Sequence, residues 1–322
     1  MQNQIKIILS DMSDYLNIAQ MKLLQESLVK RLEYEINNDK IVENNKYLTM
    51  YLSAKQVEGC SVRTLSYYQS TVEKMLSMIE APIRKITTEI IRDYLKRYQL
   101  INNCSRTTVD NIRRNLSSFF SWLEEENHIL KNPVRRIKKI KVKTTIKEII
   151  SDEQIEVMRD ACTNKRDLAI VEMLYSTGIR VGELAKLDIK DINFSERECI
   201  VYGKGDKERK VYFDAKTKLH LKQYLDERKD GSQALFVTLN KPFERIQISG
   251  IEIRIRNLGR SLGYTNIHPH KFRRTMATRA IDKGMPIEQV QQLLGHQQID
   301  TTMKYAMVNQ SNVKNSHKKF IG

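Results

Sequence analysis

Apolar residues in the first half of the chain recur with the period of an amphipathic α-helix. Val109, Ile112 and Leu116, for example, are spaced by three and four residues, so their side chains share one helical face. Ser105 precedes this run at the place of a helix N-cap. The same spacing predicts helices over 43–58, 62–79, about 87–100 and 106–128. We therefore expect an all-helical domain over residues 41–132.

Residues 1–40 form a separate, nearly neutral segment that is also predicted to be helical. Leu24, Leu28 and Leu32 lie four residues apart within it. The segment fits an accessory helix, an oligomerisation arm or a helix packed on the first domain. We favour the packed helix.

The second half combines helical periods with one pair of strands. Residues 198–202 and 209–213 predict two strands, and Gly203–Lys207 predicts the turn of a hairpin between them. Helices are predicted over 152–162, 166–176, 215–229, 248–262, 270–283, 286–294 and 300–308. The chain is thus expected to be mainly α, with an N-terminal helical domain and a C-terminal mixed α+β domain, residues 151–322, that contains a small antiparallel sheet.

Several helix ends of the second half carry specific signals. Ser151 and Gln154 have the spacing of a capping box. Gly178 and Gly295 stand where helices end, and Pro286 stands where the first residue of a helix is expected.

A basic segment, residues 133–150, separates the two domains. Residues 131–147 contain eight Lys or Arg and no acidic residue, and Pro133 interrupts any helix at its start. This segment is predicted to be an interdomain linker. It fits a solvated connector and a strap along DNA phosphates about equally well.

Charge and cysteine content narrow the class of protein. The chain has 55 Lys and Arg against 39 Asp and Glu, a net charge of +16 that suits a polyanionic partner such as nucleic acid or an anionic membrane surface. Neither a run of about 18 apolar residues nor a secretory signal is present, so we expect a cytoplasmic protein without a membrane partner. The four cysteines are far apart and predict neither a zinc site nor a disulfide framework.

Six side chains of the second half are candidates for chemistry, although each alone is a weak signal. They are Arg180, Lys204, His270, Arg273, His296 and Tyr305. Taken singly, these residues also have ordinary structural explanations. Arg180 fits an ion pair with Glu183, and Lys204 fits a solvated hairpin tip. His270 fits a capping histidine, Arg273 a basic helix end and Tyr305 a core tyrosine, one of 14 tyrosines in the chain.

Together these residues supply what phosphoryl transfer to a tyrosine hydroxyl needs without a metal or cofactor. The arginines neutralise charge on the phosphate in the transition state. A tyrosine with a pKa of about 10 needs a base, which a histidine provides. The leaving 5′-oxygen needs a proton, which Lys204 can supply. The phosphotyrosine ester keeps the bond energy, so rejoining needs no ATP.

The order of these motifs resembles the tyrosine recombinase (phage integrase) family, especially its short Xer-like members. The resemblance rests on TGIRVGELAKL, GKGDKERKV, HPHKFRRTMAT and LLGHQQIDTTMKY, which together span residues 177–305. It implies a site-specific recombinase that works through a 3′-phosphotyrosine and a Holliday junction. In such an enzyme, residues 41–132 would form the core-binding domain and four protomers would hold two DNA duplexes, with or without accessory proteins.

The same resemblance implies a role for each candidate. Arg180 and Arg273 would bind the phosphate, and His296 would stabilise it. Lys204 would be the general acid, His270 the proton acceptor and Tyr305 the nucleophile. Glu183 would support the first arginine.

One position departs from the family, which often has Leu-Arg-His where this chain has Phe272-Arg273-Arg274. We expect this change to affect packing or a phosphate contact and to leave activity intact. Other interpretations of the chain are a type IB topoisomerase, a telomere resolvase, a DNA-binding protein without catalysis and a basic helical scaffold.

Overall fold

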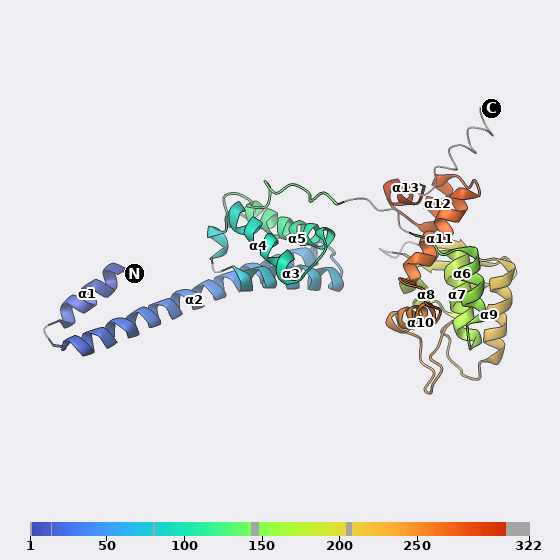
Figure 1. The fold of residues 1–322 in the computed structure, drawn as a ribbon, viewed down its shortest axis with the longest axis horizontal. Helices are drawn as coiled ribbons and strands as arrows, with labels where there is room; N and C mark the ends of the chain where they lie inside the picture. Colours follow the sequence, from blue (N-terminus) through green and yellow to red (C-terminus); the bar gives the residue numbers. More distant parts are fainter. Residues whose placement is uncertain (1, 14, 80, 143–147, 204–207, 307–322) are drawn as a thin grey trace, which may run out of the picture. The chain divides into compact units, whose positions relative to one another are not determined.

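The computed structural model describes residues 2–13, 15–79, 81–142, 148–203 and 208–306. The chain divides into two compact units, residues 1–144 and 145–322 (Figure 1). The first unit is helical, and the second combines helices with a three-stranded antiparallel sheet. This confirms the predicted fold class.

The first unit is built from five α-helices and one 3-10 turn within its described residues. They are α1 (Gln2–Met12), α2 (Ile18–Val57), α3 (Val62–Met78), η1 (Ile83–Lys85), α4 (Thr88–Ile101) and α5 (Arg106–Glu125). Three of these helices begin at a hydroxyl side chain that accepts a hydrogen bond from the backbone N–H three residues on: Ser61 in α3, Thr87 in α4 and Ser105 in α5. The predicted helix entry at Ser105 is thereby confirmed.

Aromatic and aliphatic side chains from α2 to α5 form the core of this unit. Tyr51, Met75, Leu116 and Phe119 are fully buried there. The periodic positions of α5 point inward, and this buried face explains why its spacing was a reliable signal.

The helix predicted over 43–58 is the last part of a much longer one. The start predicted at residue 43 is wrong, because α2 runs unbroken from Ile18, where Asn17 and Gln20 form a capping box. The boundary predicted between the segment 1–40 and the helical domain 41–132 therefore falls inside α2. The polar run from Asn37 to Lys40 lies within this helix and does not end it.

The beginning of the basic segment packs against the first unit. Val134 is 1% exposed and belongs to its core, with Ile140 partly buried beside it. The Ile140 N–H donates to Asp110 Oδ1 at 3.0 Å, and the Thr88 hydroxyl donates to the Pro133 carbonyl at 2.7 Å. Residues 133–140 are thus held on the helical unit.

The second unit packs its helices around α7. Its elements are α6 (Asp152–Asp160), α7 (Lys165–Thr177), α8 (Val181–Lys186), η2 (Ile189–Asp191), β1 (Ile192–Asn193), β2 (Glu198–Tyr202), β3 (Glu208–Tyr212), α9 (Ala215–Glu227), α10 (Ile248–Ser261), α11 (Pro269–Asp282), α12 (Ile287–Leu294) and α13 (Ile299–Ala306). Ala169, Val171, Met173 and Leu174 of α7 are all fully buried, because neighbouring elements cover the helix on most sides. Helix α8 and strand β1 were not predicted.

The predicted hairpin is confirmed, with β3 beginning one residue earlier than expected. In the antiparallel register, Cys199 pairs with Val211 and Val201 pairs with Arg209. Cys199, Val201 and Val211 face the core. The turn residues 204–207 lie outside the described residues.

The predicted helix ends are largely confirmed. Ser151 and Gln154 form the capping box of α6, and Gly178 and Gly295 end α7 and α12 in the left-handed conformation. The prediction for Pro286 is wrong by one position, because Pro286 is the N-cap and the helix begins at Ile287.

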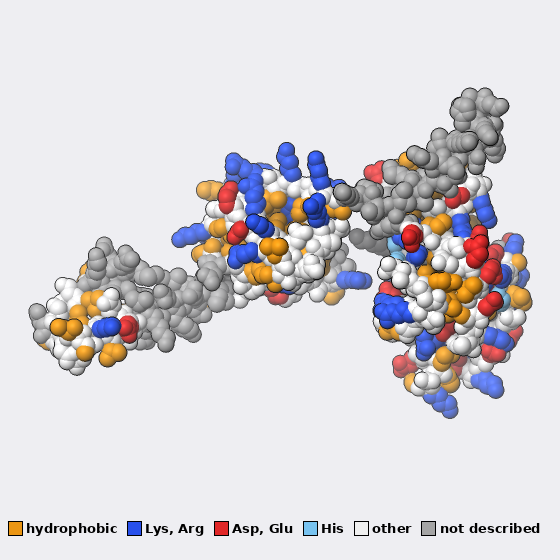
Figure 2. Space-filling model, in the orientation of Figure 1, with side chains coloured by type: hydrophobic (Ala, Val, Ile, Leu, Met, Phe, Trp, Pro, Cys, Tyr) orange, Lys and Arg blue, Asp and Glu red, His pale blue; other side chains and the backbone are white. Residues whose placement is uncertain are grey.

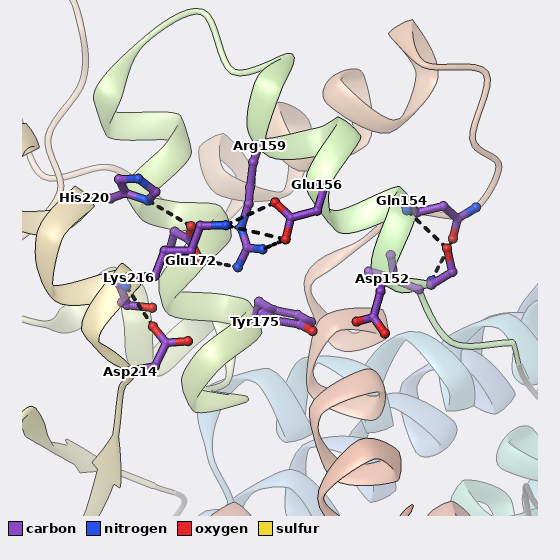
Figure 3. Close-up of polar contacts among 12 residues, drawn as sticks. Asp152, Gln154, Glu156, Arg159, Glu172, Tyr175, Asp214, Lys216 and His220 are labelled. Carbon is purple, nitrogen blue, oxygen red and sulfur yellow. Dashed lines mark hydrogen bonds and ion pairs between the residues drawn. The ribbon is translucent and has the colours of Figure 1, made fainter.

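A buried polar network joins α6, α7 and α9 (Figure 3). Glu172 is fully buried and accepts hydrogen bonds from Arg159 at 2.9 and 2.7 Å. His220 Nδ1 lies 2.8 Å from the same carboxylate. Because a buried carboxylate must be paired, these contacts fix how the three helices pack.

Candidate active site

The ends of α7 and α12 define one side of the candidate site. Each helix ends at a glycine with positive φ, +60° at Gly178 and +64° at Gly295, so that the chain turns sharply there. The last carbonyl groups of a helix lack partners within the helix and carry partial negative charge. In this protein they accept hydrogen bonds from arginine side chains.

Arg273 joins the two helix ends. It is the fifth residue of α11, just past the first turn, and is 2% exposed. Its Nη1 donates to the Gly178 carbonyl at 2.8 Å, and its Nη2 donates to the Leu294 carbonyl. Burial, followed by the charges of Arg180 and Arg209, lowers the pKa of Arg273 to about 10, so the side chain stays charged at neutral pH.

Arg180 lies at the exposed edge of the same site. It is the N-cap of α8, and 42% of its side chain is exposed. Its Nη2 donates to the Gly295 carbonyl at 3.3 Å and its Nη1 donates to Glu183 Oε1 at 2.8 Å. The ion pair with Glu183, one of the two sequence interpretations of Arg180, is present, and the charge of Arg180 also acts on Arg273.

Glu183 is the buried carboxylate that orients the arginines. It also accepts two hydrogen bonds of 2.7 Å from Arg209 on β3. Burial alone would raise the pKa of Glu183, but the hydrogen bonds from Arg209 and Arg180 outweigh it and lower this pKa. Glu183 is therefore ionised at neutral pH.

His296 follows directly on Gly295 and contacts Arg273. Its Nε2 lies 3.1 Å from Arg273 Nη2, and its Nδ1 lies 2.9 Å from Thr302 Oγ1. Burial, then the charges of Arg273, Arg180, His270 and Arg209, lowers the pKa of His296 to about 4. The imidazole is neutral at physiological pH.

Tyr305, which lies on α13, packs beside His296. The two ring centroids are 6.0 Å apart and the ring planes are inclined by 28°. Tyr305 is 7% exposed, in a small apolar cluster with Ala277, Val290 and Leu294 of α11 and α12. The loop after α12 and helix α13 thus bring Tyr305 back to His296.

His270 and Lys204 are the two remaining candidates. His270 is exposed at the start of α11, and its charge contributes to the lowered pKa of His296, which places it in the same electrostatic environment. Lys204 lies outside the described residues.

Sequence reasoning missed two polar residues of this site. Arg209 binds Glu183 and donates from Nε to the Leu293 carbonyl at 3.2 Å. Thr302 is fully buried against His296. Arg209 lies in the quoted hairpin motif and Thr302 in the last motif, but their partners come from distant parts of the chain, which one sequence does not reveal.

Arg274, the departure from the family pattern, is used in packing. Its Nε donates to the Glu148 carbonyl at 3.1 Å, and the side chain is largely buried. On the same helix, the Thr275 hydroxyl accepts from the Ile150 N–H and Arg279 donates to the Ile150 carbonyl, both at 3.0 Å. Helix α11 thus holds the segment that enters this unit.

Within the described residues, no group of three or more His, Cys, Asp or Glu side chains lies close enough together to hold a metal ion. Nor does any described helix have the length and hydrophobicity needed to span a membrane. What the site offers is a set of guanidinium groups around a neutral histidine and a tyrosine, a combination suited to an anionic group such as a phosphodiester.

Two family patterns match this chain. The phage integrase family matches residues 135–312, and the phage integrase N-terminal SAM-like domain matches residues 48–129. The chain therefore belongs to the phage integrase family, the tyrosine recombinases, which are enzymes that break and rejoin DNA.

Its relatives include Xer recombinases. Tyrosine recombinase XerC of Thermodesulfovibrio yellowstonii is 31% identical over 82% of this chain and 92% of its own length. The crystal structure of XerA recombinase matches 87% of this chain and 99% of its own with 28% identity and a TM-score of 0.50. XerH recombinase, bound to palindromic difH substrate after cleavage, shares the fold with a TM-score of 0.67 at 20% identity, over 81% of each chain.

Proposed function

We propose that this chain catalyses site-specific recombination with Tyr305 as its nucleophile. The observation that carries the proposal is the convergence of Arg180, Arg273 and His296 beside Tyr305 at the ends of α7 and α12. Three unrelated stretches of sequence supply these groups, and each faces the same small region.

In the proposed reaction, Tyr305 Oη attacks the scissile phosphorus and the bond from phosphorus to the 5′-oxygen breaks. The tyrosine proton passes to His270, and Lys204 donates a proton to the leaving 5′-oxygen. Arg180 and Arg273 bind the non-bridging oxygens with forked N–H groups, and His296 contacts the same phosphate. The product is a 3′-phosphotyrosine, which a free 5′-hydroxyl attacks in the reverse direction to rejoin the strand.

The partner we propose is double-stranded DNA with a specific recombination site. The basic side chains on both units support an interaction with phosphates (Figure 2). Exposed cations of the first unit include Arg106, Arg114, Arg136, Lys138 and Lys139. A homotetramer on two duplexes, strand exchange through a Holliday junction, accessory proteins and a cytoplasmic location complete the proposal.

A covalent-trapping experiment tests the nucleophile. The substrate is a nicked duplex whose site is first selected from a random-sequence library by binding to this protein. We expect a protein–DNA band on a denaturing gel with the wild type and none with Tyr305→Phe, because the phenyl ring has no oxygen to attack phosphorus. Tyr212→Phe, a change of an exposed tyrosine on β3, is the matched control and should form the band.

Equal bands from wild type and Tyr305→Phe would overturn the assignment of the nucleophile, and a wild type without a band would overturn the proposed function. Arg180→Lys should lose most of the cleavage, since a point charge cannot replace the bidentate fork.

A further inference from the structure

The side chain of Thr302 meets the candidate site from a fully buried position. Its exposed fraction is 0%, and its hydroxyl oxygen lies 2.9 Å from His296 Nδ1. On the opposite side of the same imidazole, Nε2 lies 3.1 Å from Arg273 Nη2. His296 is therefore held at both nitrogens.

These two contacts determine where the proton of the neutral imidazole resides. A guanidinium group has only donors, so Arg273 can hydrogen-bond to Nε2 only if that nitrogen carries a lone pair. The proton of the neutral ring must then be on Nδ1, where the Thr302 hydroxyl accepts it. In the other tautomer, Nε2–H and the Arg273 N–H would be two donors facing each other.

We propose that Thr302 is a positioning residue that keeps a proton on His296 Nδ1, so that Nε2 is the nitrogen presented to Arg273 and to the scissile phosphate. This inference rests on the proposed function for its role in catalysis, while the proton position follows from the contacts alone. When the phosphate binds, Nε2 gives up its contact with Arg273. The negative charge of the phosphate favours the imidazolium, so Nε2 takes up a proton from solvent and donates it to a phosphate oxygen, while Nδ1–H stays with Thr302.

The position of Thr302 also connects His296 to the nucleophile. Thr302 and Tyr305 are three residues apart on α13, so they lie on one side of that helix. Tyr305 packs on α11 and α12 while Thr302 meets His296. The hydrogen bond between Thr302 and Nδ1 can thus form only when α13 packs on α11 and α12. In the same arrangement Tyr305 lies beside the imidazole.

Thr302→Val is the informative change, because valine keeps the branched shape and removes the acceptor. Thr302→Ser restores the hydroxyl. Thr278→Val is the matched control, since Thr278 of α11 is 1% exposed and its hydroxyl is among the described buried groups without a hydrogen-bond partner. Thermal unfolding of all variants verifies that each is folded.

The first measurement is long-range ¹H–¹⁵N correlation NMR of the full chain labelled at histidine, with His296→Gln to assign the signal. At about pH 8 the ring is neutral, and we expect the Nδ1–H pattern in the wild type and in Thr302→Ser. Thr302→Val should shift toward the Nε2–H form. An Nε2–H pattern in the wild type overturns the inference whether or not the protein cleaves DNA.

The second measurement is the rate of covalent complex formation on the nicked duplex. Because the imidazolium that contacts the phosphate would lose the acceptor for its Nδ1–H, Thr302→Val should lower this rate about 10- to 100-fold at unchanged DNA affinity, the size of effect seen when metal-bound histidines lose their outer-shell partner. Thr302→Ser and Thr278→Val should stay close to the wild type. A Thr302→Val rate equal to the wild type overturns the positioning role, and a wild type that never forms the complex overturns the proposed function and leaves the NMR result to decide the proton position.

Discussion

At the scale of single residues, the candidate site is a cluster of positive charges stabilised by backbone carbonyl groups. Arg273 and Arg180 bind the Gly178, Leu294 and Gly295 carbonyls, and Glu183 neutralises part of the charge. Carbonyls at helix ends are suitable partners because they carry partial negative charge. They hold the guanidinium groups in place, beside the imidazole of His296.

His296 makes the stability of the protein depend on pH in a predictable direction. Its pKa is about 4 in the folded chain and 6.5 in its ordinary state, so between these values the unfolded chain binds more protons. Stability should therefore fall as pH decreases from about 6.5 to about 4. The charges that disfavour the imidazolium come from Arg273 and His270 on α11, Arg180 before α8 and Arg209 on β3, after burial as the main cause.

Thermal unfolding of wild type and His296→Gln across this pH range checks the prediction. The glutamine variant should lose less of its melting temperature between pH 6.5 and 4, because it has no imidazole to protonate. Parallel curves for the two proteins would contradict it.

At the scale of secondary-structure elements, the sequence predicted what local chemistry determines. The hairpin, the capping box of Ser151 and the glycine ends of α7 and α12 follow from turn residues and hydroxyl caps. Helix α8 was not predicted because a helix of six residues is too short to show the helical period of apolar positions. The placement of Arg209 and Thr302 depends on tertiary packing, so local patterns could not predict it.

The left-handed end of α12 leads to a prediction about Gly295. A Cβ at this position would lie 2.8 Å from Arg209 Cδ, and φ is +64°. Gly295→Ala should therefore lose about 1–2 kcal/mol to backbone strain, and it should also displace the arginine that binds Glu183. We expect lower stability and, in addition, slower covalent complex formation.

Gly263→Ala separates the two effects. Gly263 also has positive φ, +72°, but an added Cβ meets nothing within 4 Å. Gly263→Ala should therefore have the same backbone strain as Gly295→Ala but cleave at the rate of the wild type. If both variants cleave at the same rate, displacing Arg209 does not affect cleavage. Chemical denaturation and the trapping assay provide the two readouts.

At the scale of the whole molecule, the net charge of +16 and the basic segment concern the same question, namely how the protein holds DNA. Residues 133–140 pack on the helical unit, so this part of the segment has a fixed place from which its cations project. Arg136, Lys138 and Lys139 are exposed there. Cations that are held in a fixed, solvent-facing position can contact DNA phosphates and so release counterions from the duplex. A connector that does not touch the DNA releases none.

Replacing these three residues by glutamine should weaken DNA binding and flatten its dependence on salt. If all three contact phosphates, the slope of log K against log salt should decrease by about 2–3, since each neutralised phosphate contributes about 0.9. Fluorescence anisotropy over a salt series measures the slope. The matched control replaces Lys165, Lys210 and Lys216, whose charges are already paired with Glu227, Glu198 and Glu156. Since those pairs leave little charge for DNA, that variant should keep the wild-type slope. An unchanged slope in the first variant would instead make residues 136–139 a solvated connector, and the phosphate contacts would then have to come from the other exposed cations of the chain.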